Sequence, residues 1–174
     1  MYNVDFCKRM LGNIYSASYY PIKRSFGQTL QTCPIDALIA YSKLSKTKNR
    51  TQQNIEFLVA GLCYNTIKPD QNRPTFVRFE TVLRRLNREK DIENFLKLRY
   101  DDTGYFANRF MSLAKKVIPL LSPNEQFDYI HLISDLVDWN KNNNTKMRWA
   151  MSILNLYEVN EETTNNEENE EERN

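Results

Sequence analysis

Apolar residues recur every three to four positions along almost the whole chain, and this helical spacing constrains the fold more than any other feature. In the clearest example, one helix face carries Phe127, Ile130, Ile133, Leu136 and Val137. The 174 residues include only four Gly and six Pro, too few for an all-β chain that turns about every 8–12 residues. We therefore expect an all-α fold, a bundle of seven to nine helices.

Caps and prolines mark several of the expected helix ends. Ser122 suits an N-cap, Pro123 the first helical position, and Glu125 the reciprocal position of a capping box. Thr75 and Thr51 are the expected starts of two earlier helices. The expected helices run through residues 6–14, 34–41, 51–62, 75–86, 92–98, 106–117, 122–137 and 147–154.

The chain divides at polar segments. Residues 57–65 are apolar on most sides, so their helix is expected to cross the core. The polar segment 65–74 contains two prolines and is expected to separate an N-terminal half, residues 1–68, from a C-terminal half, residues 75–158, as two small sub-bundles. Residues 159–174 show no apolar period and predict a disordered acidic tail.

The chain lacks the residue patterns that most recognisable catalytic chemistry requires. His131 is the only histidine, and Cys7, Cys33 and Cys63 stand alone, without the paired spacing of a Cys/His zinc site. Their odd number argues against a disulfide framework. No Gly-Lys-Ser/Thr sequence provides a P-loop. We expect no catalytic residue, no cofactor and no metal ion. No window approaches 18 consecutive apolar residues and no signal peptide begins the sequence, which predicts a cytoplasmic protein without a membrane partner.

The small net charge of +2 conceals an uneven distribution. Residues 159–174 contain seven Glu and one Arg, so the other 158 residues carry 23 Lys and Arg against 15 Asp and Glu. A basic body favours a polyanionic partner, because Lys and Arg neutralise backbone phosphates without reading bases. Ordinary solubility remains the alternative explanation for any single exposed cation. The run of Lys43, Lys46, Lys48 and Arg50 stands out, since no acid occurs between residues 36 and 56.

Charge placement adds candidates elsewhere. Arg78 and Arg85 are seven positions apart and are expected to share one helix face. Tyr19, Tyr20 and Tyr64 are the aromatic residues that fit the apolar stripes least and could stack on bases. The candidates for nucleic-acid binding from charge placement are Lys46, Lys48, Arg78 and Lys141.

The segments FVRFETVLRRL, IENFLKLRY, FDYIHLISDLVDWN and KMRWAMSIL together resemble the small subunit of the type I-E CRISPR Cascade surveillance complex, the CasB family. The most specific part is the pair Asp138-Trp139, followed by a polar turn and the pair Arg148-Trp149. Upstream, PIKRSFG and NRTQQNIEFLVAGL are similar to a basic motif and an apolar helix of the family. The resemblance covers about residues 15–157.

This resemblance implies an all-α subunit, present as a pair in the complex, that stabilises the R-loop in antiviral defence without catalysis. Its implied partners are single- and double-stranded DNA, the guide RNA within the complex, other Cascade subunits and a second copy of itself. By local match, the implied nucleic-acid-binding residues are Lys23, Arg24, Arg50, Arg109, and Lys146 or Arg148.

Two other functions are consistent with the sequence. A helical protein–protein adaptor would use the basic face against an acidic protein and would not contact nucleic acid. A small DNA-binding regulator would need a helix-turn-helix, and no such pair of helices with a Gly-containing turn is visible.

Overall fold

The computed structural model describes residues 2–14, 16, 19–68, 73–141 and 143–154. Its elements in chain order are α1 (Tyr2–Gly12), α2 (Tyr20–Arg24), α3 (Ile35–Ser42), α4 (Arg50–Thr66), β1 (Thr75–Val77), α5 (Phe79–Arg84), α6 (Glu89–Leu96), α7 (Tyr105–Val117), the 3₁₀ helix η2 (Ile118–Leu120), β2 (Glu125–Phe127), α8 (Tyr129–Asp138) and α9 (Asn144–Ile153). The expected all-α class is confirmed, with one very short sheet added. The acidic tail, residues 159–174, lies outside the described residues.

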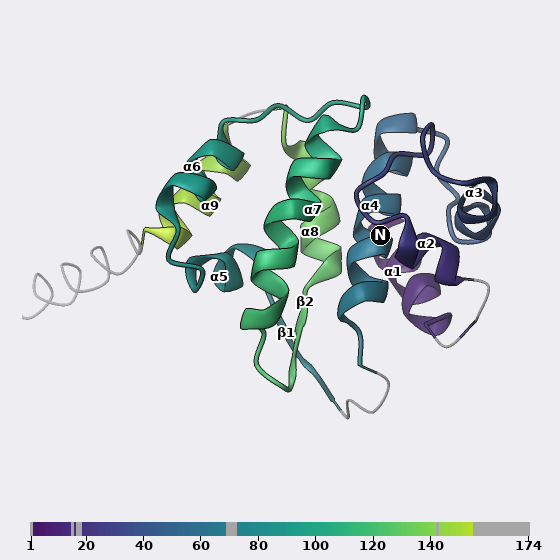
Figure 1. Cartoon of the computed structure of the whole chain (residues 1–174), viewed down its shortest axis with the longest axis horizontal. Helices are drawn as coiled ribbons and strands as arrows, with labels where there is room; N and C mark the ends of the chain where they lie inside the picture. The colour runs from purple at the N-terminus through teal and green to yellow at the C-terminus, as the bar shows by residue number, and fades with distance from the viewer. Residues whose placement is uncertain (1, 15, 17–18, 69–72, 142, 155–174) are drawn as a thin grey trace, which may run out of the picture.

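The helices form two ends joined through a centre. Figure 1 shows α1, α2, α3 and α4 at one end and α5, α6 and α9 at the other, with α7 and α8 between them. The division into independent halves at residues 65–74 stays a prediction, because buried side chains from both ends join one hydrophobic cluster and residues 69–72 are not described.

Helix α4 crosses the hydrophobic core, as the apolar stretch 57–65 predicted. Residues 54–64 of this helix are all buried. Its N-cap is Asn49, whose side chain accepts a hydrogen bond from the Gln52 backbone N–H at 2.9 Å. The expected cap at Thr51 is therefore wrong, because Asn49 supplies a capping oxygen one half-turn earlier.

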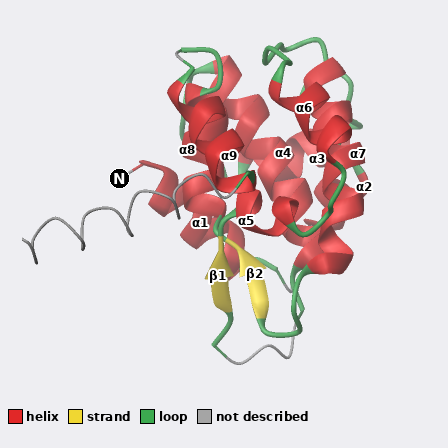
Figure 2. Ribbon diagram, turned by 90° about the vertical axis from the view of Figure 1, so that its left-hand side faces the viewer, coloured by secondary structure: helices red, strands yellow, loops and turns green. Residues whose placement is uncertain are grey.

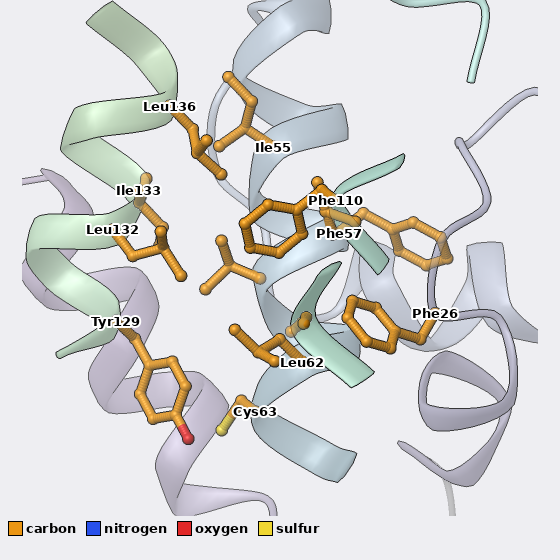
Figure 3. Packing of buried hydrophobic residues seen from close by; sticks show 14 of the residues in the cluster. Phe26, Ile55, Phe57, Leu62, Cys63, Phe110, Tyr129, Leu132, Ile133 and Leu136 are labelled. Atoms are coloured by element: carbon orange, nitrogen blue, oxygen red, sulfur yellow. The ribbon is translucent and has the colours of Figure 1, made fainter. Parts of the chain in front are cut away.

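Helix α8 packs against α4 along its apolar face. Burying each large aliphatic or aromatic side chain here contributes about 1.5–3 kcal/mol. The Tyr129 hydroxyl also shares a 2.7 Å hydrogen bond with the hydroxyl of Thr66 at the end of α4. Figure 3 shows Tyr129, Leu132, Ile133 and Leu136 of α8 directed toward Ile55, Leu62 and Cys63 of α4.

A two-stranded parallel sheet replaces two of the expected helix starts. Thr75 pairs with Glu125 and Val77 with Phe127 (Figure 2). The helices predicted to begin at Thr75 and Ser122 begin later, at Phe79 and Tyr129. Both predictions were wrong because pairing between segments 50 residues apart overrides local helix signals.

The local signal at Ser122 is nonetheless real. Its backbone N–H donates to the Glu125 carboxylate at 2.9 Å, as in a capping box. The chain then extends, and Asp128 caps α8 by accepting from the His131 backbone N–H at 3.1 Å.

The end formed by α5, α6 and α9 holds an aromatic core. Trp139 and Trp149 are fully buried, with ring centroids 5.2 Å apart in an edge-to-face arrangement. Phe79 lies 5.6 Å from Trp149 and 5.1 Å from Phe127 of β2. The two tryptophans of the most specific sequence motif therefore serve packing.

Candidate nucleic-acid interface

The segment after α3 together with the first residue of α4, residues 43–50, carries four exposed cations, and we call it the basic connector. Lys43, Lys46, Lys48 and Arg50 are all exposed. None of the four forms an ion pair with a carboxylate in the described parts of the chain. Their charge is therefore available to an external anion.

A buried glutamate braces the basic connector. Glu56 of α4 is fully buried and accepts hydrogen bonds from the Tyr41 hydroxyl at 2.7 Å and the Ser45 hydroxyl at 2.9 Å. Burial raises the pKa of Glu56, and these hydrogen bonds oppose that rise. The Gln53 side-chain amide donates to the Thr47 carbonyl at 2.8 Å. These bonds hold the connector backbone against α4 and so fix where its cations project.

The last turn of α2 adds two exposed cations. Lys23 has no ion pair among the described residues, whereas the Arg24 guanidinium lies 3.8 Å from the exposed Asp36 carboxylate. Tyr20 is 60% exposed beside them. Tyr19 and Tyr64 are buried and pack on each other with centroids 5.8 Å apart. Of these three tyrosines, only Tyr20 presents a ring on which a base could stack.

Arg109 projects from the exposed face of α7. It forms no ion pair within the described structure, while the neighbouring Lys116 binds Asp91 at 2.9 Å. Arg109 and Lys116 lie seven positions apart on α7, but in the described structure only Lys116 has a carboxylate partner. A count of charges treats Arg109 and Lys116 as equivalent, but the structure shows that only Lys116 already binds a carboxylate.

Arg78 and Arg85 do not share a helix face. Helix α5 spans Phe79–Arg84, so one arginine precedes it and the other follows it. Arg85 binds Glu125 at 2.6 and 2.9 Å, and Arg78 lies 3.9 Å from Glu80. The expectation failed because the first expected turn of the helix is strand β1.

Arg148 is engaged by two buried carboxylates. Its guanidinium donates to Glu80 at 2.8 Å and also to Asp135. The Trp149 indole N–H donates to the other Asp135 oxygen at 2.8 Å. Burial raises the pKa of Glu80, and the positive charge of Arg148 opposes that rise. We call Glu80, Asp135, Arg148 and Trp149 the Arg148 cluster.

The two lysines near the turn before α9 are also engaged. The Lys146 ammonium donates to the Leu98 carbonyl at 2.7 Å and lies 5.4 Å from the Trp139 ring centroid. Burial lowers the pKa of Lys146. Lys141 pairs with Asp138 at 2.7 Å, and both side chains are exposed. An exposed pair of this kind contributes little and can exchange for a phosphate.

Two cations of α1 lie beside the basic connector in the structure, and the sequence alone did not indicate this. Lys8 and Arg9 of α1 line a hollow together with Lys46. Residues 8 and 9 are adjacent in α1, but no sequence signal links them to residue 46.

Potential metal ligands, the histidine and the thiols have the following surroundings in the described part of the chain. No group of three or more His, Cys, Asp or Glu in the described ranges could hold a metal ion. His131 lies 2.5 Å from the Asp128 carboxylate on the surface. Burial raises the pKa of the Cys7 thiol to about 12, so this sulfur stays protonated at neutral pH. None of the described helices is both long and apolar enough to cross a bilayer.

Comparison with known proteins gives a consistent result. The family model for CRISPR-associated protein Cse2 matches residues 21–152. A Cse2-family CRISPR-associated protein from Thermus thermophilus is 15% identical, with a TM-score of 0.64 over 88% of this chain and 97% of that one. CasB from M. ruber is 14% identical, with a TM-score of 0.65 over 94% and 98% of the two chains. No curated protein matches the sequence. At these identities the two structures establish a shared fold.

Proposed function

The chain belongs to the Cse2 family of CRISPR-associated proteins, and from that premise we propose that it is a non-catalytic, nucleic-acid-binding subunit of a Cascade surveillance complex. In this role it holds the target and displaced DNA strands and so stabilises the R-loop in antiviral defence. The observation that carries the proposal is the basic connector, whose four exposed cations have no carboxylate partner among the described residues.

The physics of R-loops makes such contacts effective. Forming an R-loop exchanges one duplex for another of similar stability, so modest contacts to the strands can tip the balance. Lysine and arginine side chains bind phosphates regardless of base sequence. Because the connector backbone is already held against α4, binding has only to order its side chains.

The proposed contact residues fall into three groups by what they already bind. Lys23, Lys48, Arg50 and Arg109 are exposed and have no ion pair in the described structure. Arg24, Arg78 and Lys141 have carboxylates nearby at 3.8, 3.9 and 2.7 Å. Lys146 and Arg148 are engaged inside the fold, so we assign them to supporting the structure beneath the interface.

Binding to oligonucleotides at several salt concentrations tests the proposal. We expect Arg50→Glu and Arg109→Glu to weaken binding of single- and double-stranded DNA while the melting temperature stays unchanged. Arg88→Glu is the matched control, because Arg88 already faces Asp91 at 3.6 Å. Undetectable binding of the wild-type protein to both kinds of strand at low salt would contradict the proposal.

A contact to another protein subunit is favoured by a separate observation. Ile35, Leu38 and Ile39 lie three and four positions apart on one face of α3 and are 73%, 38% and 55% exposed. We propose that this apolar face packs against another subunit of the same complex. Ile35→Ser with Ile39→Ser should reduce incorporation into the complex and leave DNA binding by the isolated chain intact.

Nuclease treatment of the assembled complex separates the adaptor hypothesis from nucleic-acid binding. A complex that survives nuclease treatment and retains no DNA would favour a protein-only adaptor. If the variant with Ile35→Ser and Ile39→Ser entered the complex as well as the wild type does, the proposed protein contact would be wrong.

A further inference from the structure

A hollow beside α1 extends the positive charge of the basic connector. Asp5, Lys8 and Arg9 of α1 line it together with Lys46 of the connector, and its volume is about 360 Å³. Three cations therefore face one carboxylate. Within the described residues none of the three cations forms an ion pair, not even with Asp5.

Arg9 is held in place by the connector itself. Its Nε donates a 2.7 Å hydrogen bond to the carbonyl of Leu44, which is fully buried. No other hydrogen bond of the guanidinium occurs in the described part of the chain, so its Nη donors remain available. An anchored guanidinium keeps its planar set of donors and loses little entropy when it binds an oxyanion.

Both walls of the hollow are fixed to α4. On the connector side, the Ser45 hydroxyl donates to Glu56 at 2.9 Å, which positions the adjacent Lys46. On the α1 side, the Tyr64 hydroxyl donates to the Met10 carbonyl at 3.1 Å, one residue after Arg9. The backbone of both walls is therefore fixed before any ligand arrives, and the exposed side chains of Lys8 and Lys46 extend from it.

We infer that this hollow binds one phosphodiester group of a nucleic-acid strand, with Lys8, Arg9 and Lys46 as its ligands. The inference rests on the proposed function and adds α1 to the contact surface. Lys and Arg carry only donors, so the ligand must be an acceptor, and the excess of cations over Asp5 requires it to be anionic. With a volume of about 360 Å³, the hollow leaves room for one phosphodiester group.

Affinity for a single-stranded oligonucleotide, measured over a range of salt concentrations, tests the inference. We expect Lys8→Ala and Lys46→Ala each to weaken binding about fivefold and to make its salt dependence shallower. Because both lysines face one phosphate, the double variant should lose less affinity than the two single losses combined. The control Lys90→Ala removes an exposed lysine of α6, at the other end of the molecule in Figure 1, and should bind like the wild type.

The outcomes separate this inference from the proposed function. If the wild-type protein binds with salt dependence and Lys8→Ala behaves like Lys90→Ala, the phosphate site is overturned and the proposed function stands. If the wild-type protein shows no salt-dependent binding, both are overturned. Unchanged melting temperatures for Lys8→Ala and Lys46→Ala would confirm that the fold is intact; Arg9 is left in place because it anchors Leu44.

Discussion

The basic connector and the Arg148 cluster use the same kind of charge in opposite ways. In the connector, four cations project into solvent with no carboxylate at ion-pair distance in the described structure. In the Arg148 cluster, one arginine faces Glu80 and Asp135, whose carboxylates are almost fully buried. The comparison shows that the surroundings of a cation, and not its presence in a basic stretch, decide whether it serves binding or folding.

The cost of burying charge explains the difference. A carboxylate buried in the protein loses its hydration, so it needs a cation and hydrogen bonds to remain ionised. Arg148 and the Trp149 indole supply these to Asp135. An exposed lysine keeps its hydration and needs no partner, so the connector can hold its cations free for a ligand.

Removing the arginine of the Arg148 cluster should have the largest effect on stability. We expect Arg148→Ala to lower the free energy of unfolding by about 2–4 kcal/mol, because it leaves two buried carboxylates without compensation while the 35% exposure of Arg148 lets water screen them in part. Urea unfolding measures this. Arg50→Ala, the matched change in the connector, should stay within about 0.5 kcal/mol of the wild type.

A rescue variant sharpens this result. Adding Glu80→Gln and Asp135→Asn to Arg148→Ala removes the uncompensated charge and should restore part of the lost stability. If Arg148→Ala and Arg50→Ala were equally stable, the proposed difference between the two regions would be wrong.

Removing the buried Glu56 carboxylate, which holds the connector through hydrogen bonds, should have the next largest effect on stability. Glu56→Ala removes the acceptor of the Tyr41 and Ser45 hydroxyls, and we expect a loss of about 1–3 kcal/mol of stability. It should also weaken DNA binding, although a negative charge is removed, because the connector loses its fixed position.

The conservative variant Glu56→Gln keeps an acceptor oxygen and is the control for the brace. It should retain more stability and more DNA binding than Glu56→Ala in the same unfolding and filter-binding assays. Stronger DNA binding by Glu56→Ala would show that simple charge repulsion, and not bracing, governs the connector.

Local patterns predicted the parts of the molecule that depend on local physics. The apolar stretch 57–65 predicted that α4 crosses the core. The run without acids between residues 36 and 56 marked the connector, whose cations form no ion pair in the described structure. Strands β1 and β2 were missed, because three-residue strands are stable only through their pairing with each other.

Long-range contacts account for what the sequence could not show in the candidate site. Arg148 meets Glu80 across 68 positions of sequence, and Arg9 meets the Leu44 carbonyl across 35. Charge placement alone cannot distinguish the engaged Arg148 from the exposed Arg50. Only the fold brings carboxylates to Arg148 and leaves Arg50 without one in the described structure.

An acid-dependent contact near β2 should have the smallest effect. Hydrogen bonds from Arg85 hold the pKa of Glu125 at about 2, below its ordinary value of 4.5. Since the pKa is lower in the folded state, the pair stabilises the protein above about pH 4.5, and that contribution is lost as pH falls toward 2. Because Arg85 is partly exposed, we expect only about 0.5–1 kcal/mol.

Melting temperatures between pH 7 and pH 2 measure this contribution. Glu125→Gln should lower the melting temperature slightly at pH 7 and not at pH 2. Glu89→Gln replaces an exposed acid that has no ion pair in the described structure. The change in melting temperature between pH 7 and pH 2 should be the same for this variant as for the wild type. An identical pH profile for Glu125→Gln and the wild type would rule out the contribution of this pair.

The salt dependence of single-stranded DNA binding by two charge-matched triple variants tests the central claim most directly. Lys43→Ala, Lys48→Ala and Arg50→Ala remove free cations of the connector, whereas Arg88→Ala, Lys97→Ala and Lys116→Ala remove cations that already face Asp91 or Glu93. We expect the first variant to make the negative slope of log affinity against log salt shallower by about 0.7 per lost phosphate contact. The second variant should leave the slope nearly unchanged. Equal slopes for the two variants would contradict a role for the connector beyond net charge.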